Sequence, residues 1–111
     1  MKRIANRDAR EYVRNKEHFK GSNLFTDELE LPRSMLYIVY SYGRHFPMFI
    51  AETDEDNVTR WYMNVDKYSR STGKQKTQAH PGYHMTLLTT REMLAVERGG
   101  FVSLIERKLN P

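Results

Sequence analysis

The chain has 111 residues, a net charge of +4 and no cysteine, so disulfides, thiolate metal sites and a cysteine nucleophile are excluded. A chain of this length is typical of one domain with one modest core. The first residues lack the apolar segment of a signal peptide, and the longest apolar run, at 35–40, is too short to cross a bilayer. We therefore expect a cytoplasmic protein without a membrane partner.

The charge is arranged in blocks along the chain. Residues 1–20 hold seven Lys/Arg against three Asp/Glu, and residues 60–84 hold five against one. Between them, residues 21–59 hold two Lys/Arg against seven Asp/Glu. Two basic blocks flanking an acidic one can steer an anionic partner, although the solvated faces of an ordinary globule also carry such blocks.

Apolar and aromatic side chains recur every three or four residues near the N-terminus, which predicts an amphipathic helix over residues 7–18. Asn6 suits its N-cap and Gly21 its C-cap. A second set of positions, spaced 4-3-4, predicts one line of arginines along the other helix face: Arg3, Arg7, Arg10 and Arg14. Such a line is either simply solvated or meets phosphate.

Three strands follow a connection that spans residues 20–34 and includes a short edge strand ended by Pro32. The strands are predicted at 35–42, 45–53 and 58–65 from their β-branched and aromatic content. Pro47 has no amide proton, so it should lie at a strand start or a sheet edge. Short polar turns between the strands predict an antiparallel meander, a sheet type that tolerates one solvated face.

The period of two in a strand assigns side chains to opposite faces of this sheet. Trp61 is the best core candidate of the third strand. Within the first strand, Tyr37, Val39 and Ser41 should share one face, and the other face should hold Leu36, Ile38, Tyr40 and Tyr42.

Segment 66–84 has no hydrophobic periodicity, and we predict it to be a long basic loop. Loops longer than about 15 residues inside a compact domain are usually functional or disordered. Beyond it, the spacing Thr89-x-x-Glu92 is that of a capping box and predicts a helix over 90–98. Gly99 and Gly100 should end that helix. Residues 101–109 fit either a last strand, which their β-branched residues favour, or a second helix.

These elements predict a single α+β domain over residues 1–111. No catalytic or cofactor motif is present in the sequence, so we assign no catalytic residue, cofactor or metal. His80 and His84 have the spacing of a helical metal site, but Pro81 and Gly82 between them oppose a helix. A metal-independent phosphodiesterase with His45 and His80 as acid and base stays open as a less favoured alternative.

The favoured hypothesis is a binding module for nucleic acid or another phosphate-bearing ligand. The segment at 66–84 offers cations and small hydrogen-bond donors, the groups that position proteins on phosphates. Aromatic side chains of the neighbouring strands could stack on unpaired bases or pack in the core. The candidate contact residues are Arg44, His45, Lys67, Tyr68, Ser69, Arg70, Ser71, Thr72, Lys74, Lys76 and His80.

Several segments resemble a family of small bacteriophage and mobile-element proteins without an assigned biochemical function. They are FKGSNL at 19–24, YIVYSYGRHFPMFI at 37–50, and WYMNVDKYSRST at 61–72 leading into QAHP at 78–81. The family pattern often has His where this chain has Gln75. The resemblance implies a phage accessory protein and transfers no catalytic residue.

That resemblance raises an alternative to nucleic-acid binding. Small phage proteins often block host machinery, so the partner could be a host protein or a nucleoprotein complex of a defence system such as a CRISPR effector. The acidic block at 21–59 could then imitate phosphate toward a basic groove. A homodimer formed by strand addition at an exposed sheet edge also stays open.

Overall fold

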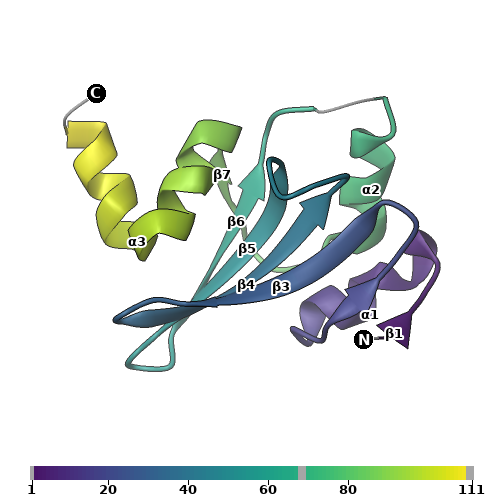
Figure 1. The fold of residues 1–111 in the computed structure, drawn as a ribbon, viewed down its shortest axis with the longest axis horizontal. Coiled ribbons are helices and arrows are strands. Elements are labelled where there is room, and N and C mark those ends of the chain that lie inside the picture. Colours follow the sequence, from purple (N-terminus) through teal and green to yellow (C-terminus); the bar gives the residue numbers. More distant parts are fainter. Residues whose placement is uncertain (1, 68–69, 110–111) are drawn as a thin grey trace.

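The computed structural model describes the backbone of residues 2–67 and 70–109 and the side chains of this part as far as residue 105. The fold is a compact α+β domain, as predicted, with one seven-stranded sheet whose strand order is the chain order (Figure 1). The elements are β1 Lys2–Arg3, η1 Asn6–Asp8 (a 3-10 turn), α1 Ala9–Arg14, β2 Phe19–Lys20, β3 Leu24–Glu30, β4 Ser34–Ser41, β5 Pro47–Asp54, β6 Thr59–Asn64, α2 Thr72–Ala79, β7 Thr86–Leu88 and α3 Thr90–Leu109.

The centre of the sheet is the predicted meander. Strands β2 to β6 pair antiparallel, with Ile38 opposite Ile50 and Ala51 opposite Trp61. Pro47 begins β5 and lies opposite Tyr40 next to a register shift, so its missing amide falls where the ladder is irregular. The connection at 20–34 contains more strand than expected, because β3 pairs along its whole length with β4.

The two outer ladders are parallel, which the sequence pattern did not predict: β1 pairs with β2, and β6 with β7. Each of these pairs needs a crossover connection, and the crossovers contain α1 and α2. Both crossovers step in the same direction across the sheet between strands of the same orientation. Because such connections are right-handed in nearly all proteins, both helices must lie on the same face of the sheet. Figure 1 shows α1 and α2 together, with α3 on the other side.

Helices cover both faces of the sheet, so this antiparallel meander has a core on each side. One core lies under α1 and α2 and includes Val13, Val39 and Ala79. The other lies under α3 and includes Ile38, Met93 and Val96. The alternation predicted for β4 is confirmed within the strand, since Tyr37 and Val39 belong to the first core and Leu36, Ile38 and Tyr40 to the second.

The first helix is shorter than predicted. The α-helical part ends at Arg14, and Lys16 follows with a left-handed φ of 53°, so the chain has turned before His18. Asn6 is not a cap of α1; its side chain accepts the Ser22 amide at 3.0 Å. Gly21 is not a helix cap either, because it lies after β2, where a Cβ would stand 2.3 Å from the Asn6 Oδ1 atom.

The prediction of a loop over 66–84 is wrong, because α2 occupies Thr72–Ala79. Its buried residues are Thr72, Gln75 and Ala79, at positions i, i+3 and i+7. They have the helical period, but two of the three are polar. A search for apolar periodicity therefore does not find this helix.

The start of α3 is capped as predicted. The Thr89 hydroxyl accepts the Glu92 amide at 3.2 Å, and the Glu92 carboxylate accepts the Thr89 amide at 3.0 Å. Gly99 and Gly100 leave helical geometry, Gly100 with a φ of 69°, and residues 101–109 then continue as helix and not as a strand. None of the helices in the described part of the chain has the length and apolar content needed to span a membrane.

The kink in α3 is held by one buried carboxylate from the sheet. Glu52 in β5 is 4% exposed and accepts the Ser34 hydroxyl and the Tyr62 hydroxyl, each at 2.9 Å. It also accepts the Phe101 amide at 3.2 Å, at the start of the second helical part. Through Glu52, hydrogen bonds link the start of the outer half of α3 to β4, β5 and β6, and Leu104 of the same half packs in the core.

Candidate functional site

Three segments meet at the end of the sheet where β2, β4 and β6 finish. The amide of Tyr42 donates to the Asn23 carbonyl at 2.8 Å, and the Tyr42 hydroxyl lies 2.5 Å from the Ser71 hydroxyl. These residues belong to the three separate segments 19–24, 37–50 and 61–72 of the sequence. The fold therefore brings three segments that are distant in the sequence together in one place.

The Tyr42 segment has an unusual conformation and a buried polar contact beneath it. Tyr42 has a φ of 67°, which costs energy for a residue with a Cβ atom. Next to it, the Ser41 hydroxyl donates to the Gln75 Oε1 atom at 2.6 Å. Gln75 is 2% exposed, and its Nε2 group has no hydrogen-bond partner among the described residues. Sequence reasoning assigned no contact to Ser41 or Gln75, since their pairing depends on the undetected helix α2.

The two basic blocks of the sequence lie side by side. Helix α2 packs against both η1 and α1. The Arg10 guanidinium donates through Nη2 to the Thr77 carbonyl at 3.1 Å, so a side chain of the first block caps an acceptor of the second. We call the outer surface of η1, α1 and α2 the basic face. Its exposed cations are Arg7, Arg10, Arg14 and Lys74.

No ion pair joins a cation of the basic face to a carboxylate among the described side chains, although Asp8 and Glu11 are exposed on the same elements. The ion pairs found among the described side chains are His18–Glu28, Arg44–Asp27 and Arg60–Asp54, and none of them involves η1, α1 or α2. The only acidic residue in 60–84 is Asp66. Its carboxylate accepts the Thr90 amide at 2.8 Å, which lowers the pKa of Asp66 and directs its charge to the start of α3.

The predicted contact residues near α2 differ in accessibility. Lys67, Arg70 and Lys74 are exposed, and Ser71 is half-buried beside Tyr42. Thr72 is buried, so its side chain is not part of the surface. Lys76 donates to the Asp66 carbonyl at 2.8 Å, and burial lowers the pKa of its ammonium group. Tyr68 and Ser69, also predicted, lie outside the described residues.

Arg44 does not belong to the basic face. Its guanidinium pairs with the Asp27 carboxylate and lies over the rings of Phe25 at 5.7 Å and Tyr40 at 5.5 Å. Both rings pack with the core under α3. The hydrogen bond from Arg44 lowers the pKa of Asp27, so the Asp27 carboxylate stays charged and balances the charge of Arg44. The position of Arg44 does not follow from strand alternation, because β4 ends at Ser41 and the chain turns at Tyr42, which has a left-handed φ.

The two histidines of the phosphodiesterase alternative have separate surroundings. His80 packs edge-on against Phe49 at 5.9 Å, and its Nδ1 atom accepts the Gly82 amide at 3.0 Å. Burial and the nearby Arg10 lower the pKa of His80. His45 is exposed in the turn after Tyr42. No hydrogen bond joins the two imidazoles in the described part of the chain, and no cluster of three metal-binding side chains is found there.

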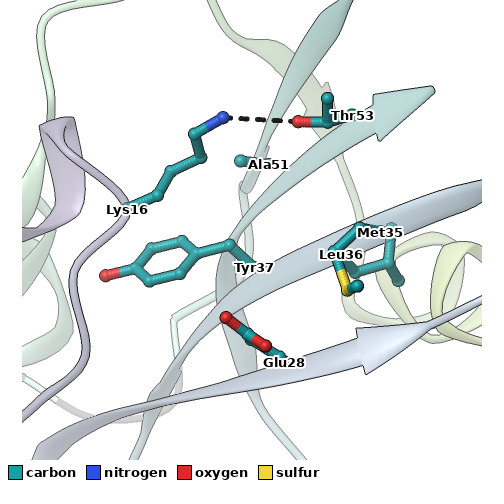
Figure 2. A pocket seen from close by; sticks show the side chains of 7 residues that line it. All are labelled: Lys16, Glu28, Met35, Leu36, Tyr37, Ala51 and Thr53. Atoms are coloured by element: carbon teal, nitrogen blue, oxygen red, sulfur yellow. Dashed lines mark hydrogen bonds between the residues drawn. The ribbon is translucent and has the colours of Figure 1, made fainter. Parts of the chain in front are cut away.

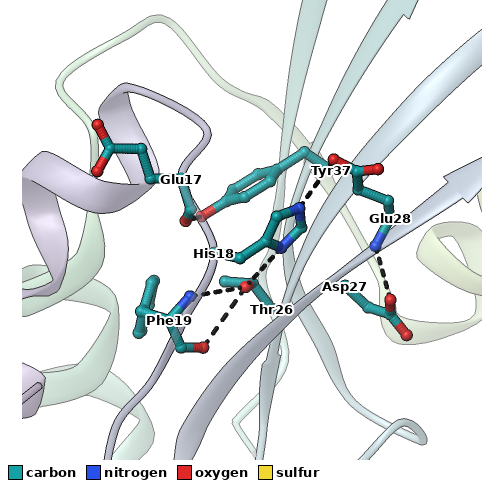
Figure 3. Close-up of polar contacts among 7 residues, drawn as sticks. All are labelled: Glu17, His18, Phe19, Thr26, Asp27, Glu28 and Tyr37. Carbon is teal, nitrogen blue, oxygen red and sulfur yellow. Dashed lines mark hydrogen bonds and ion pairs between the residues drawn. The ribbon is translucent and has the colours of Figure 1, made fainter. Parts of the chain in front are cut away.

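A row of hydrogen bonds through Thr26, His18 and Glu28, on the sheet face covered by α1 and α2, was not predicted from the sequence. In Figure 3, His18 lies between Thr26 and Glu28, with Nδ1 2.9 Å from the Thr26 hydroxyl and Nε2 2.8 Å from the Glu28 carboxylate. The order hydroxyl, imidazole, carboxylate is that of an activated nucleophile. Thr26, however, is 2% exposed and already accepts the Phe19 amide at 3.0 Å. These hydrogen bonds therefore hold β2 against β3, and the buried Thr26 hydroxyl is not accessible to a substrate.

Next to this row of hydrogen bonds lies a small pocket of about 270 Å³ (Figure 2). The Lys16 ammonium reaches across it to the Thr53 hydroxyl at 3.3 Å. On one wall, Tyr37 donates its hydroxyl to the Glu17 carbonyl at 2.7 Å, and burial raises the pKa of Tyr37 above its usual value. The polar side chains of this pocket thus already have partners within the protein, and the basic face is the stronger candidate.

Known proteins offer no guide to this site. No protein-family model matches the chain, and neither the curated proteins nor the solved structures contain a significant match to it.

Proposed function

We propose that the protein binds the phosphate backbone of nucleic acid through the basic face. The observation that carries the proposal is the joining of two distant basic blocks into one surface whose cations lack carboxylate partners among the described side chains. Exposed Arg and Lys groups that are not paired can exchange their counterions for phosphates.

The distribution of acidic residues supports the same surface. Asp54, Glu55 and Asp56 form the tip of the β5–β6 hairpin, and Glu30 ends β3 at the neighbouring tip. Figure 1 shows both tips at the left of the molecule and the basic face at the right. Such a charge separation orients a polyanion during encounter, so that the basic face meets it first.

The action on the ligand is binding without covalent change. Arg7, Arg14 and Lys74 present flexible charged groups, which fix position on a phosphate chain and read no sequence. The turn at Tyr42 ends next to this surface, where its hydroxyl meets Ser71 at the start of α2. We assign Tyr42 the role of positioning α2.

The proposal is tested by measuring the affinity for nucleic acid across a salt series in two charge-reversal variants, one in each crossover connection. In Arg7→Glu and Lys74→Glu, the slope of log affinity against log salt should decrease by about 0.7 to 0.9 for each phosphate that the variant no longer neutralises. Arg33→Glu is the matched control, because it changes the net charge equally at the β3–β4 tip. A salt-independent affinity, or an equal decrease in the Arg33 variant, would refute the proposal.

A second candidate is an inhibitor that docks on a basic groove of a host protein or nucleoprotein complex. The observation in its favour is the acidic tip at Asp54, Glu55 and Asp56, together with the resemblance to phage proteins. A triple substitution of these residues to Asn, Gln and Asn should then release a partner that the Arg7 and Lys74 variants still bind. Retention of the partner by the triple variant would end this alternative.

A further inference from the structure

The outer edge of the sheet leaves part of β6 uncovered. Strand β7 pairs only with the second half of β6, from Tyr62 to Asn64. The first half, Thr59 to Trp61, pairs with β5 on its inner side and with no strand on its outer side in the described part of the chain. Backbone groups in this stretch that point away from β5 are therefore available to a ligand.

A groove of about 570 Å³ lies along this open edge and has aromatic walls. Tyr83 is 42% exposed and stacks on Trp61, with ring centres 5.4 Å apart and an interplanar angle of 25°. On the other wall, Phe101 is 38% exposed at the start of the outer half of α3. His84 and Thr86 add polar groups to the lining.

Guanidinium groups lie against both walls. Arg14, at the end of α1, is 5.8 Å from the centre of the Tyr83 ring and connects the groove to the basic face. Arg60 is 4.7 Å from the centre of the Phe101 ring and 3.6 Å from the Asp54 carboxylate. Arg60 is paired with Asp54, whereas Arg14 has no ion pair among the described side chains. Arg14 is therefore the guanidinium beside this groove that is available to bind a phosphate.

The groove differs from its neighbour on the other side of Phe101. That second groove, also of about 570 Å³, is lined by four carboxylates as well as three arginines. The groove at the β6 edge is lined by Arg60 and His84 and by no acidic residue. Its charge and its aromatic content together suit a flat, hydrogen-bonding group that is attached to an anion.

We infer that the groove between Tyr83 and Phe101 accepts an unpaired nucleobase, so that the ligand of the basic face is single-stranded nucleic acid. The base lies against the aromatic walls, its polar edge faces the open backbone of Thr59 to Trp61, and its phosphate meets Arg14. Base stacking on aromatic side chains tolerates any sequence, as does the basic face. The inference rests on the proposed function and adds to it the strandedness of the ligand.

Trp61 provides a direct measurement, because it is the only tryptophan in the sequence. Its fluorescence is recorded while four probes are added: a single-stranded oligothymidine, an abasic oligonucleotide of equal length, a duplex and an extended peptide. We expect the base-containing single strand to quench Trp61 and to bind on the order of ten-fold more tightly than the abasic one. Tyr83→Leu should remove this difference, and Tyr83→Phe should restore it.

The outcomes separate the inference from the proposal on which it rests. Equal, salt-dependent affinity for abasic and base-containing strands would overturn the inference and leave the basic face as a phosphate-binding surface. Quenching by the peptide alone would overturn it in favour of strand addition at the β6 edge. A lack of binding to every oligonucleotide would overturn both. The abasic comparison uses the unaltered protein, so it decides the question even if Tyr83→Leu does not fold.

Discussion

The helix α3 and the pair α1 and α2, which cover opposite faces of the sheet, differ in how their surroundings use charged side chains. On the α3 side, the buried Glu52 accepts three hydrogen bonds, and the exposed Arg44 is paired with Asp27. Under α1 and α2, the small side chains of Ala9 and Ala79 pack on the sheet. The charged residues of those two helices remain on the outside.

This difference suggests that one set of charged residues serves the stability of the fold and the other is available to a ligand. A carboxylate held by several donors fixes the geometry of the elements around it and is no longer free for intermolecular binding. Exposed cations without a carboxylate partner contribute little to folding, since exposed charges far from such networks rarely matter for stability. The α3 face is therefore expected to be sensitive in folding experiments, and the basic face in binding experiments.

The largest effect is expected from Glu52→Ala. The substitution leaves the Ser34 hydroxyl, the Tyr62 hydroxyl and the Phe101 amide without their acceptor. We expect the free energy of unfolding to decrease by about 3 kcal/mol, measured by urea denaturation. The control is Glu55→Ala at the exposed tip of the same strand pair, which should change stability by less than about 0.5 kcal/mol. Similar decreases in both variants would remove the distinction between the faces.

A pair of glycines gives the next largest contrast. Gly100→Ala places a Cβ atom 2.2 Å from the Glu52 carboxylate at a φ of 69°, and should destabilise the protein by about 2 kcal/mol. In α2, a Cβ atom at Gly73 meets nothing within 4 Å. Gly73→Ala should therefore stabilise the protein by roughly 0.5 kcal/mol through helix propensity. Thermal denaturation of both variants checks the signs, and a stabilised Gly100 variant would contradict the kinked geometry.

The smallest effect concerns the pH dependence of stability. Burial raises the pKa of Glu97, beside Tyr40, above its ordinary 4.5, so its stabilising contribution is complete below pH 4.5 and is lost as pH rises through the folded-state pKa. Burial and Arg10 lower the pKa of His80 below 6.5, so its contribution is present above pH 6.5 and is lost as pH falls through the folded-state pKa.

The corresponding variants should differ from the unaltered protein in opposite directions. Relative to it, the melting temperature of Glu97→Gln should improve as pH rises from 4.5 to 7, and that of His80→Gln as pH falls over the same range. The pH profiles of melting temperature measure both trends. Parallel profiles for all three proteins would show that neither group is perturbed by folding.

The sequence predicts the centre of this fold well and its borders poorly. Strands β4, β5 and β6 are rich in aromatic and β-branched residues, and the Thr89–Glu92 capping box is local, so both are visible in short windows. The parallel ladders at β1 and β7 depend on pairing after a crossover, and strands of two or three residues carry no pattern of their own. Residues 101–109 stay ambiguous because the Glu52 contact that anchors them comes from a distant strand.

The candidate site follows the same division. Exposed cations such as Lys67, Arg70 and Lys74 can be selected from composition alone. The burial of Thr72 and the position of Arg44 on the other face cannot, because the first requires α2 and the second requires the left-handed turn at Tyr42. Tyr83 was not selected, since only the register of β7 against β6 brings it to Trp61.

Neighbouring strands of the sheet are also neighbours in the sequence, and this has a consequence for the order in which the protein folds. The hairpins that join β3 to β6 close short loops, and such contacts form early because little chain entropy is lost. The parallel pairs β1–β2 and β6–β7 close longer loops and are expected to form later. Since each crossover delivers half of the basic face, that surface is assembled only after both ends of the chain have docked. A nascent or partly folded chain would thus present its meander without the basic face, and on the function proposed above it would complete its binding surface only in the last step of folding.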